Sequence, residues 1–320
     1  MPAEEIILKY EVPPSYEGLR VDVFLKNRLK RTSRTKVKQI IESRNCYFES
    51  GREMTPSARV EAREIICIRR EVKDEIEVPA HYGVIHEDRR ILVVDKPAGL
   101  PVHPTSRYLK NTLVGLIRRD YGETSWNLCH RIDRETSGIV LLAKDLKGER
   151  FIKKQFADRQ VHKSYLALVK GTPDPREGII KAALRRNLFS RILMKMEIAG
   201  EDDFEPGKVA VTRYITIDSS KRFALVECFP ETGRQHQIRI HMAHIGNALV
   251  GDKIYGVSES LFLDFVKYGL THRITSRLLL PRHALHAHSI SFLHPDGGKP
   301  VQYTSPLAPD IRELFEADGA

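Results

Sequence analysis

The chain has 320 residues, of which 41% are hydrophobic and 29% are charged, a balance typical of a globular protein with a sizeable core. The net charge of +10 favours a polyanionic partner, because phosphates release counterions when they bind Lys and Arg. No apolar run approaches the ~20 residues of a membrane helix, so no membrane partner is expected.

The N-terminus and the cysteines indicate a cytoplasmic protein. Residues 1–18 carry acids and prolines where a signal peptide needs a basic stretch and an apolar core. The four cysteines are scattered, with no Cys-x-x-Cys pair. This distribution favours reduced thiols and argues against disulfides or a Cys-based zinc site.

Two short amphipathic helices with basic outward faces are predicted between Arg20 and Arg44. The stretch holds nine basic residues and two acidic ones, and its apolar residues recur at helical spacing. Thr32 or Ser33 is expected to cap the second helix at its N-terminus.

Short strands complete a compact N-terminal module. Residues 45–70 read as strands around a turn at Ser50-Gly51. We therefore predict an α/β module over residues 18–70, with an extension over 1–17 before it and an acidic, proline-ended linker over 71–80 after it. A module of roughly 55 residues is marginal in size but able to fold alone.

Residues 81–320 are predicted to form a second domain of the α+β class. Apolar segments typical of strands are interspersed with helical segments, without the regular rhythm of a doubly wound sheet. The pattern favours a mixed sheet. The predicted strands are 91–95, 139–143, 164–169, 209–217 and 223–229, and the predicted helices are 111–119 and 149–158.

A first candidate site is the segment 130–138, which leads into an apolar strand. Arg131 and Arg134 flank Asp133, so a carboxylate is surrounded by groups that favour its ionised form. Polar residues at the mouth of a buried strand are a common place for function, but a turn held by local salt bridges has the same pattern. A serine-hydrolase triad built on Ser137 lacks the Gly-x-Ser-x-Gly elbow and is disfavoured.

A second candidate site spans residues 231–246, where histidines lie among arginines. Two sets of histidines could be imagined as metal ligands: His236, His241 and His244, and His283, His286 and His288. No carboxylate or cysteine completes either set at a familiar spacing, so no metal is expected. Residues 251–256 lack the glycine-rich phosphate cradle of nucleotide-binding proteins, and no nucleotide cofactor is expected.

Two shorter segments have structural interpretations when they are taken alone. Residues 95–104 form a rigid, proline-containing turn after a strand, which by itself predicts a structural loop. Tyr165, in the segment Lys163-Ser164-Tyr165, begins a strand and by itself predicts core packing.

Taken together, these segments resemble the RluA family of RNA pseudouridine synthases over nearly the whole chain. HRIDRETSGIVLLAKD is similar to the family's HRLDxxTSG-type motif, and KSYLALVKG is similar to its second motif. ETGRQHQIRIHMAHIGNALVGDKIYG resembles the third motif, and DKPAGLPVHP and RHALHAHSISFLHP also look like family segments. The resemblance implies the pseudouridine synthase fold, with a mixed, largely antiparallel central sheet flanked by helices.

Residues 18–68 resemble an S4-type RNA-binding module, in GLRVDVFL followed by SRTKVKQII. The hairpin that follows, NCYFESGRE, departs from the Asn-Gly turn usual in that module. The resemblance implies that the module contacts RNA, and we expect four of its basic residues to contribute: Arg20, Arg34, Lys36 and Lys38.

The resemblance also implies roles for residues of the second domain. Asp133 matches the catalytic aspartate and Tyr165 the active-site tyrosine, and Arg239 is preferred over Arg234 as the arginine that pairs with the aspartate. The sequence leaves open whether Asp133 acts as a nucleophile or as a base. Three further residues of these motifs are expected to contact RNA: Arg131, Arg234 and His130.

Isomerising uridine breaks a C–N bond, rotates the base and forms a C–C bond, without oxidation and without an external group. We therefore expect an isomerase that takes uridines out of the RNA stack and needs no cofactor. We also expect the protein to be monomeric and cytoplasmic. The added basic module favours large-subunit ribosomal RNA as the target. The alternatives are the same chemistry on transfer RNA, and a non-catalytic RNA-binding protein associated with the ribosome.

Overall fold

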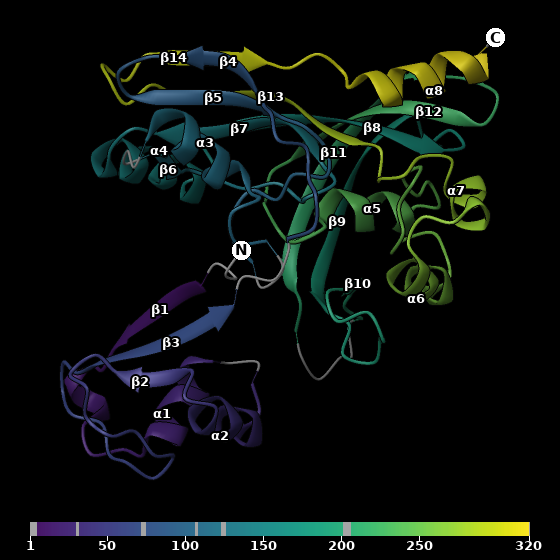
Figure 1. Ribbon diagram of the computed structural model, residues 1–320. Coiled ribbons are helices and arrows are strands. Elements are labelled where there is room, and N and C mark those ends of the chain that lie inside the picture. The colour runs from purple at the N-terminus through teal and green to yellow at the C-terminus, as the bar shows by residue number, and fades with distance from the viewer. Residues whose placement is uncertain are drawn as a thin grey trace. The chain divides into compact units, whose positions relative to one another are not determined.

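The chain folds into two compact units, Met1–Glu75 and Ile76–Ala320, shown in the computed structural model of Figure 1. The boundary falls inside the stretch 71–80 that was predicted as a linker. Among the described helices, none has the length and apolar character needed to cross a membrane. The structure describes residues 5–29, 32–71, 75–105, 108–122, 126–200 and 206–319.

A three-stranded antiparallel sheet and two helices form the N-terminal unit. The strands β1 (Glu5–Glu11), β3 (Ile65–Glu71) and β2 (Cys46–Phe48) lie in that order. A 3-10 turn, η1 (Pro14–Tyr16), precedes α1 (Val21–Arg28) and α2 (Arg34–Glu42). The structure differs from the sequence prediction at the N-terminus, because β1 pairs with the whole of β3 and so makes part of the predicted extension an integral strand of this sheet.

The second helix of this unit, α2, begins at a cap that the sequence predicts. The Ser33 side chain accepts a hydrogen bond from the backbone N–H of Lys36 at 3.2 Å. Ser33, one of the two residues predicted as the cap, is therefore the N-cap of α2. Phe24 of α1, Val37 of α2 and Phe48 of β2 are fully buried in one shared core. This core gives the unit its own source of stability.

A mixed sheet of eleven strands forms the second unit (Figure 1). Its main path runs β10-β9-β11-β12-β8-β13-β7-β5-β4, with β14 beside β13 and β6 beside β7. Only the pairing of β7 with β13 is parallel among the described strand pairs, so the predicted mixed, largely antiparallel sheet is confirmed.

The bounds of these elements differ from the sequence predictions mainly at their ends. The strands are β4 (Gly83–Glu87), β5 (Ile91–Lys96), β6 (Asn127–Leu128), β7 (Ser137–Ala143), β8 (His162–Lys170), β9 (Glu177–Arg186), β10 (Met196–Ile198), β11 (Lys208–Ser219), β12 (Phe223–Pro230), β13 (Leu285–Leu293) and β14 (Pro300–Thr304). The helices are α3 (Leu113–Tyr121), α4 (Leu146–Ala157), α5 (Gln237–His244), α6 (Glu259–Tyr268), α7 (His272–Leu278) and α8 (Pro309–Gly319).

Every residue of β7 is buried, which explains its continuous apolar sequence. Successive side chains of a strand point to opposite faces of the sheet. Ile139 and Leu141 therefore pack in the cluster that contains Ile152 of α4, while Val140 packs in the cluster that contains Leu116 of α3. Helices thus bury both faces of this strand, which carries the segment 130–138 at its entry.

The same alternation in β8 separates the site from the opposite face of the sheet. Leu168 packs with Ile311 of α8, whereas Ala167 and Val169 pack with residues of α5. Tyr165 lies against the cluster formed with α5. The tyrosine of the second motif is therefore on the face of β8 that α5 covers.

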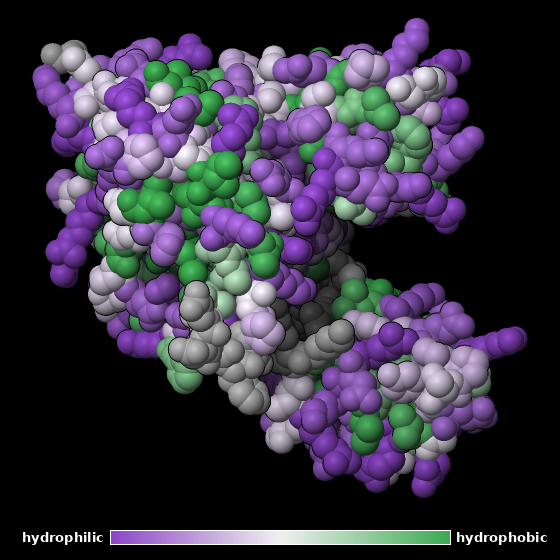
Figure 2. Space-filling view, turned by 180° about the vertical axis from the view of Figure 1, so that it is seen from behind, coloured by the Kyte–Doolittle hydropathy of each residue, from purple (hydrophilic) through white to green (hydrophobic). Residues whose placement is uncertain are grey.

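Gly138 allows β7 and β13 to approach closely beside the site. Its φ is +102°, and a Cβ atom there would lie 2.3 Å from the carbonyl oxygen of Ala287, its partner across the parallel pairing. Figure 2 shows that hydrophilic side chains cover much of the visible surface, with hydrophobic side chains in separate patches.

Candidate active site

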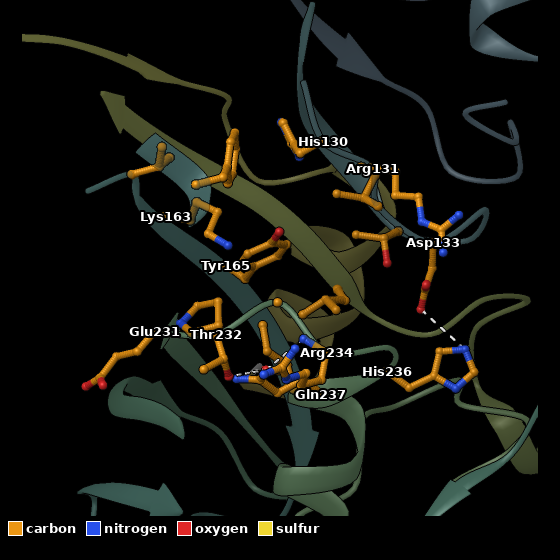
Figure 3. A pocket seen from close by; sticks show the side chains of 18 of the residues that line it. His130, Arg131, Asp133, Lys163, Tyr165, Glu231, Thr232, Arg234, His236 and Gln237 are labelled. Atoms are coloured by element: carbon orange, nitrogen blue, oxygen red, sulfur yellow. Dashed lines mark hydrogen bonds and ion pairs between the residues drawn. The ribbon is translucent and has the colours of Figure 1, made fainter. Parts of the chain in front are cut away.

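A cavity of about 540 Å³ lies in the second unit, and its wall unites the three long sequence motifs. Asp133 comes from the loop before β7, Tyr165 from β8, and Arg239 from α5. Figure 3 shows Asp133, Tyr165 and His236 around this pocket, with Arg131 and Arg234 also on its wall. Residues that are more than a hundred positions apart in the sequence therefore converge.

Asp133 forms an ion pair with Arg239. Nη1 of Arg239 donates to Oδ2 of Asp133 at 3.0 Å. The aspartate side chain is 33% exposed and the arginine side chain 5%, so the carboxylate faces the cavity while its counter-charge is buried. Arg234 is exposed instead, and its Nε is directed at the carbonyl oxygen of Val209 at 3.4 Å.

Asp252, whose side chain is fully buried, holds the other side of the Arg239 guanidinium. Nε and Nη2 of Arg239 donate to Oδ2 and Oδ1 of Asp252 at 2.6 and 2.9 Å. Burial alone would raise the pKa of Asp252, but Arg239 and the backbone N–H groups of Ile254 and Tyr255 outweigh it and lower that pKa. The guanidinium therefore has a fixed orientation toward Asp133.

His236 is a second nitrogen-bearing side chain beside Asp133. Its Nε2 lies 3.8 Å from Oδ2 of Asp133, a pair drawn as a dashed line in Figure 3. Its Nδ1 lies 2.8 Å from the hydroxyl of Tyr255, which also accepts from the backbone N–H of Met196. Burial, followed by the charge of Arg239, lowers the pKa of His236 to about 4, so the ring is neutral at neutral pH.

The backbone of His236 also has an unusual conformation. It lies at the N-terminal cap of α5 with φ +56° and ψ +19°, the left-handed region. Few residues other than glycine adopt this conformation, and such strain tends to occur at functional sites. The turn thereby brings the ring of His236 to the wall of the cavity.

Tyr165 contributes a protonated phenol to the cavity. Burial is the main reason why its pKa is raised above the ordinary value, and the negative charge of Asp133 adds to the effect. The ring can therefore offer a neutral aromatic surface and a hydroxyl donor, but not a phenolate, at neutral pH.

His130 and Arg131, both expected to contact RNA, differ in their surroundings. Arg131 is exposed, with Nη1 3.4 Å from Nε2 of His103. His130 is largely occupied by the fold, because its Nε2 accepts from the backbone N–H of Leu141 at 3.1 Å. Burial and then the charge of Lys163 lower the pKa of His130 to about 3, so this ring carries no charge for a phosphate.

The basic residues of the N-terminal unit also fall into two groups. Arg20 and Arg34 each form an ion pair with the fully buried carboxylate of Asp22, at 3.1 and 3.0 Å. Lys36 and Lys38 are exposed on α2. The two arginines therefore neutralise a buried carboxylate while their own side chains stay 41% and 51% exposed, and the contribution of all four residues to RNA binding stays a prediction.

The histidines of the second imagined metal set bind serine and threonine groups. Nε2 of His283 is 2.8 Å from the hydroxyl of Thr136, and Nδ1 of His286 is 3.0 Å from that of Ser137. Nδ1 of His288 donates to the carbonyl oxygen of Ser305 at 2.7 Å. Within the described parts of the chain, no group of three or more His, Cys, Asp or Glu side chains is arranged to hold a metal ion.

Lys96 connects the segment 95–104 to the loop that carries Asp133. Its fully buried ammonium donates to the carbonyl oxygens of Pro97 and Leu100 at 2.8 Å and of Arg134 at 3.1 Å. Burial is the main reason why the pKa of Lys96 falls to about 7. The rigid turn is thus a support for the Asp133 loop.

Asp252, Tyr255 and His236 were not predicted from the sequence to belong to one hydrogen-bond network around Arg239. His236 was weighed as a metal ligand and residues 251–256 as a phosphate cradle, and both lie in the third motif, but no contact between them was predicted. The available signal was the buried arginine itself, because a buried guanidinium needs more than one acceptor. Asp252 is a carboxylate within the same motif as Arg239 and could have been proposed on that ground.

Comparisons with known sequences agree with this geometry. The sequence profile of a family described as RNA pseudouridylate synthase matches residues 90–244. The chain is 33% identical to ribosomal large subunit pseudouridine synthase D of Zymomonas mobilis, over 99% of this chain and 98% of that protein. It is 32% identical to the protein of the same name from Xanthomonas campestris, over 99% and 94%. An uncharacterized RNA pseudouridine synthase of Bacillus subtilis is 31% identical, over 93% of each chain.

Solved structures give the same result for the fold. Human RNA pseudouridylate synthase domain containing 4 matches 73% of this chain and 92% of its own, with 27% identity and a TM-score of 0.57. Human RNA pseudouridylate synthase domain containing 1 matches 76% and 96%, with 23% identity and a TM-score of 0.58.

Proposed function

Because the chain belongs to the RluA-type family of RNA pseudouridine synthases, enzymes that isomerise uridine in RNA, we propose that it acts on large-subunit ribosomal RNA with Asp133 as its catalytic carboxylate. The observation that carries the proposal is the ion pair of Asp133 with the buried Arg239 at the wall of the cavity. The relatives named as ribosomal large subunit synthases support the choice of RNA, and that choice supports a cytoplasmic location.

The surroundings of Asp133 support a direct role in the reaction. Arg239 and His236 both approach Oδ2, whereas no described residue makes a hydrogen bond to Oδ1. Oδ1 is therefore available either to form a bond to C1′ of the ribose or to take a proton from the ribose. A carboxylate must be ionised for either step, and Arg239 forms an ion pair with Asp133 at 3.0 Å.

The reaction is balanced without an added group. The C1′–N1 bond breaks with its electron pair on the base, the base turns, and C5 forms the new bond to C1′. C5 then loses its proton and N1 gains one, so the composition of the RNA is unchanged. Tyr165 is the proposed aromatic surface for the base, and the exposed Arg131 is placed to fill the gap that a flipped uridine leaves in the RNA.

The N-terminal unit is proposed to be an RNA-binding module of the S4 type. The exposed Lys36 and Lys38 support this role, since phosphate contacts supply much of the affinity for RNA. A second RNA-binding surface suits a large ribosomal target better than a small stem-loop. The alternatives, transfer RNA as the substrate or an RNA-binding protein without catalysis, are outcomes of the experiment.

The test is to delete the gene and map pseudouridines in ribosomal and transfer RNA with carbodiimide chemistry. We expect sites to vanish from large-subunit RNA and to return with the wild-type gene but not with Asp133→Asn. Sites missing only from transfer RNA would refute the ribosomal assignment. If no site is missing, purified protein acting on unmodified transcripts would separate redundancy from a protein without catalysis.

A further inference from the structure

Lys163 lies beside Tyr165 in the cavity. The two residues are two positions apart on β8, so their side chains point to the same face of the sheet, and both line the cavity. Figure 3 shows the two side chains next to each other, with Asp133 on the far side of Tyr165 from Lys163 in this view.

The charge of Lys163 is not neutralised by the protein. No described carboxylate lies within ion-pair distance of its Nζ, and Glu231 points away from it in Figure 3. Its Nζ lies 5.5 Å from the centroid of the Phe156 ring. Burial lowers the pKa of Lys163, as expected for an ammonium held without a counter-ion.

The other cations on the cavity wall have different environments. Arg239 is bound to two carboxylates, while Arg131, Arg159 and Arg234 are exposed. The exposed arginines suit phosphates, which remain hydrated. Lys163 suits an anion that develops inside the cavity.

Uridine isomerisation creates such an anion. When the C1′–N1 bond breaks, uracil leaves with the electron pair, and the negative charge spreads from N1 to O2 and O4. A positive group already fixed near these oxygens lowers the barrier, because it interacts more strongly with the departing anion than with the neutral base.

We propose that Lys163 is a further catalytic residue, which stabilises the departing uracil anion by donating to its carbonyl oxygens. The proposal rests on the proposed function, since it places the base against Tyr165 with N1 toward Asp133. In the six-membered ring, C4 lies opposite N1 and C2 lies opposite C5. The far edge of the base therefore presents O4 before the rotation and O2 after it, and one ammonium serves both orientations.

The test compares Lys163→Met and Lys163→Gln with Lys163→Arg and, as a control for phosphate binding, Arg159→Met. Single-turnover rate constants at saturating RNA and dissociation constants at several salt concentrations are measured, with ribosomal RNA from the deletion strain. We expect both neutral variants to lower the rate constant roughly a hundredfold or more, with the dissociation constant unchanged within threefold. Lys163→Arg should restore most of the rate, and Arg159→Met should change only affinity and its salt dependence.

Thermal unfolding of the variants controls for folding. Since Lys163 has no ion-pair partner among the described residues, the neutral variants should unfold at or above the wild-type temperature. A normal rate at saturating RNA with weaker, less salt-dependent binding would make Lys163 a phosphate contact and overturn the proposal, as would variants as active as wild type. If wild-type protein forms no pseudouridine in this RNA, the proposed function itself fails, which distinguishes the two failures.

Discussion

Asp252 orients Arg239 through two parallel hydrogen bonds of 2.6 and 2.9 Å, while the remaining Nη1 of the same guanidinium donates to Asp133. A single buried arginine thus connects a fully buried carboxylate to one that faces the cavity. The orientation of the proposed catalytic group depends on a residue that does not line the cavity.

Asp252→Asn should lower activity although the substituted side chain is remote from the substrate. The amide offers only one acceptor to the guanidinium, so Arg239 loses its fixed orientation toward Asp133. We expect a roughly tenfold to hundredfold fall in the single-turnover rate, as for small misplacements of reacting groups. Asp310→Asn is the control, because Asp310 holds Arg282 by the same bidentate geometry at 2.7 Å outside the cavity wall. Equal losses in the two variants would contradict this account.

Arg239→Ala should cost more activity than Arg234→Ala. Removing Arg239 leaves Asp252 buried without its counter-charge and strips Asp133 of its ion pair, which should also lower the free energy of unfolding by roughly 3–5 kcal/mol. Arg234 is exposed, so its loss should affect mainly RNA affinity. Rates and urea unfolding of both variants give the comparison, and equal or reversed losses would show that Arg239 is not the essential partner.

Tyr255→Phe tests whether the hydrogen bond between Tyr255 and Nδ1 of His236 matters for the reaction. The change keeps the ring, whose centroid is 5.2 Å from the Arg239 guanidinium, but removes the hydroxyl that occupies Nδ1. The histidine can then place its proton on either nitrogen, and we expect a loss of about tenfold in rate with little change in RNA affinity. Tyr214→Phe removes a similar buried hydroxyl, bound to Pro175, away from the cavity and should leave the rate unchanged. A normal rate for Tyr255→Phe would show that the hydrogen bond between Tyr255 and His236 does not contribute to the reaction.

The protein should lose stability as the pH falls from about 6.5 toward 4. Burial is the main reason why the pKa values of four histidines are lowered. The pKa falls to about 3 for His130 and to about 4 for His236, His241 and His286. These rings bind protons in the unfolded chain below pH 6.5 but stay neutral in the folded one, so stability is greatest above that value. Each should cost roughly 1 kcal/mol between pH 7.5 and 5.5. Urea unfolding at the two pH values tests this, with a smaller difference expected for His286→Gln. A flat profile would contradict it.

The sequence was most informative where burial is continuous. The apolar run Ile139–Ala143 predicted a strand, and β7 is buried on both faces. Starts of helices were less accurate, because caps decided them: the Asp145 side chain accepts from the backbone N–H of Gly148 and starts α4 at Leu146, before the predicted Glu149. The partner order of the strands, including the parallel pair of β7 and β13, depends on contacts between distant segments and could not be read from local pattern.

The candidate site was predictable in its charged motifs but not in its supporting contacts. Asp133, Tyr165 and Arg239 come from segments whose resemblance to family motifs is strong. The hydrogen bond between Tyr255 and His236 depends on the left-handed turn at His236, which no residue type there predicts. Likewise, the pairing of Arg20 and Arg34 with Asp22 depends on how α1 and α2 pack and could not be predicted from local pattern.

Removal of residues 1–75 should weaken RNA binding while leaving a folded, active second unit. The cut belongs after Glu75, because the carbonyl oxygen of Ile76 accepts from the Asn111 side chain and Val78 packs in a core of the second unit. We expect a lower affinity for RNA and a weaker dependence of that affinity on salt. Each lost phosphate contact to a duplex removes about 0.9 from the slope of log affinity against log salt concentration. The double variant Lys36→Ala with Lys38→Ala should remove about 2 from the slope in the intact chain, with unchanged stability. If both proteins bind ribosomal RNA as tightly and with the same slope as wild type, the N-terminal unit is not an RNA-binding module.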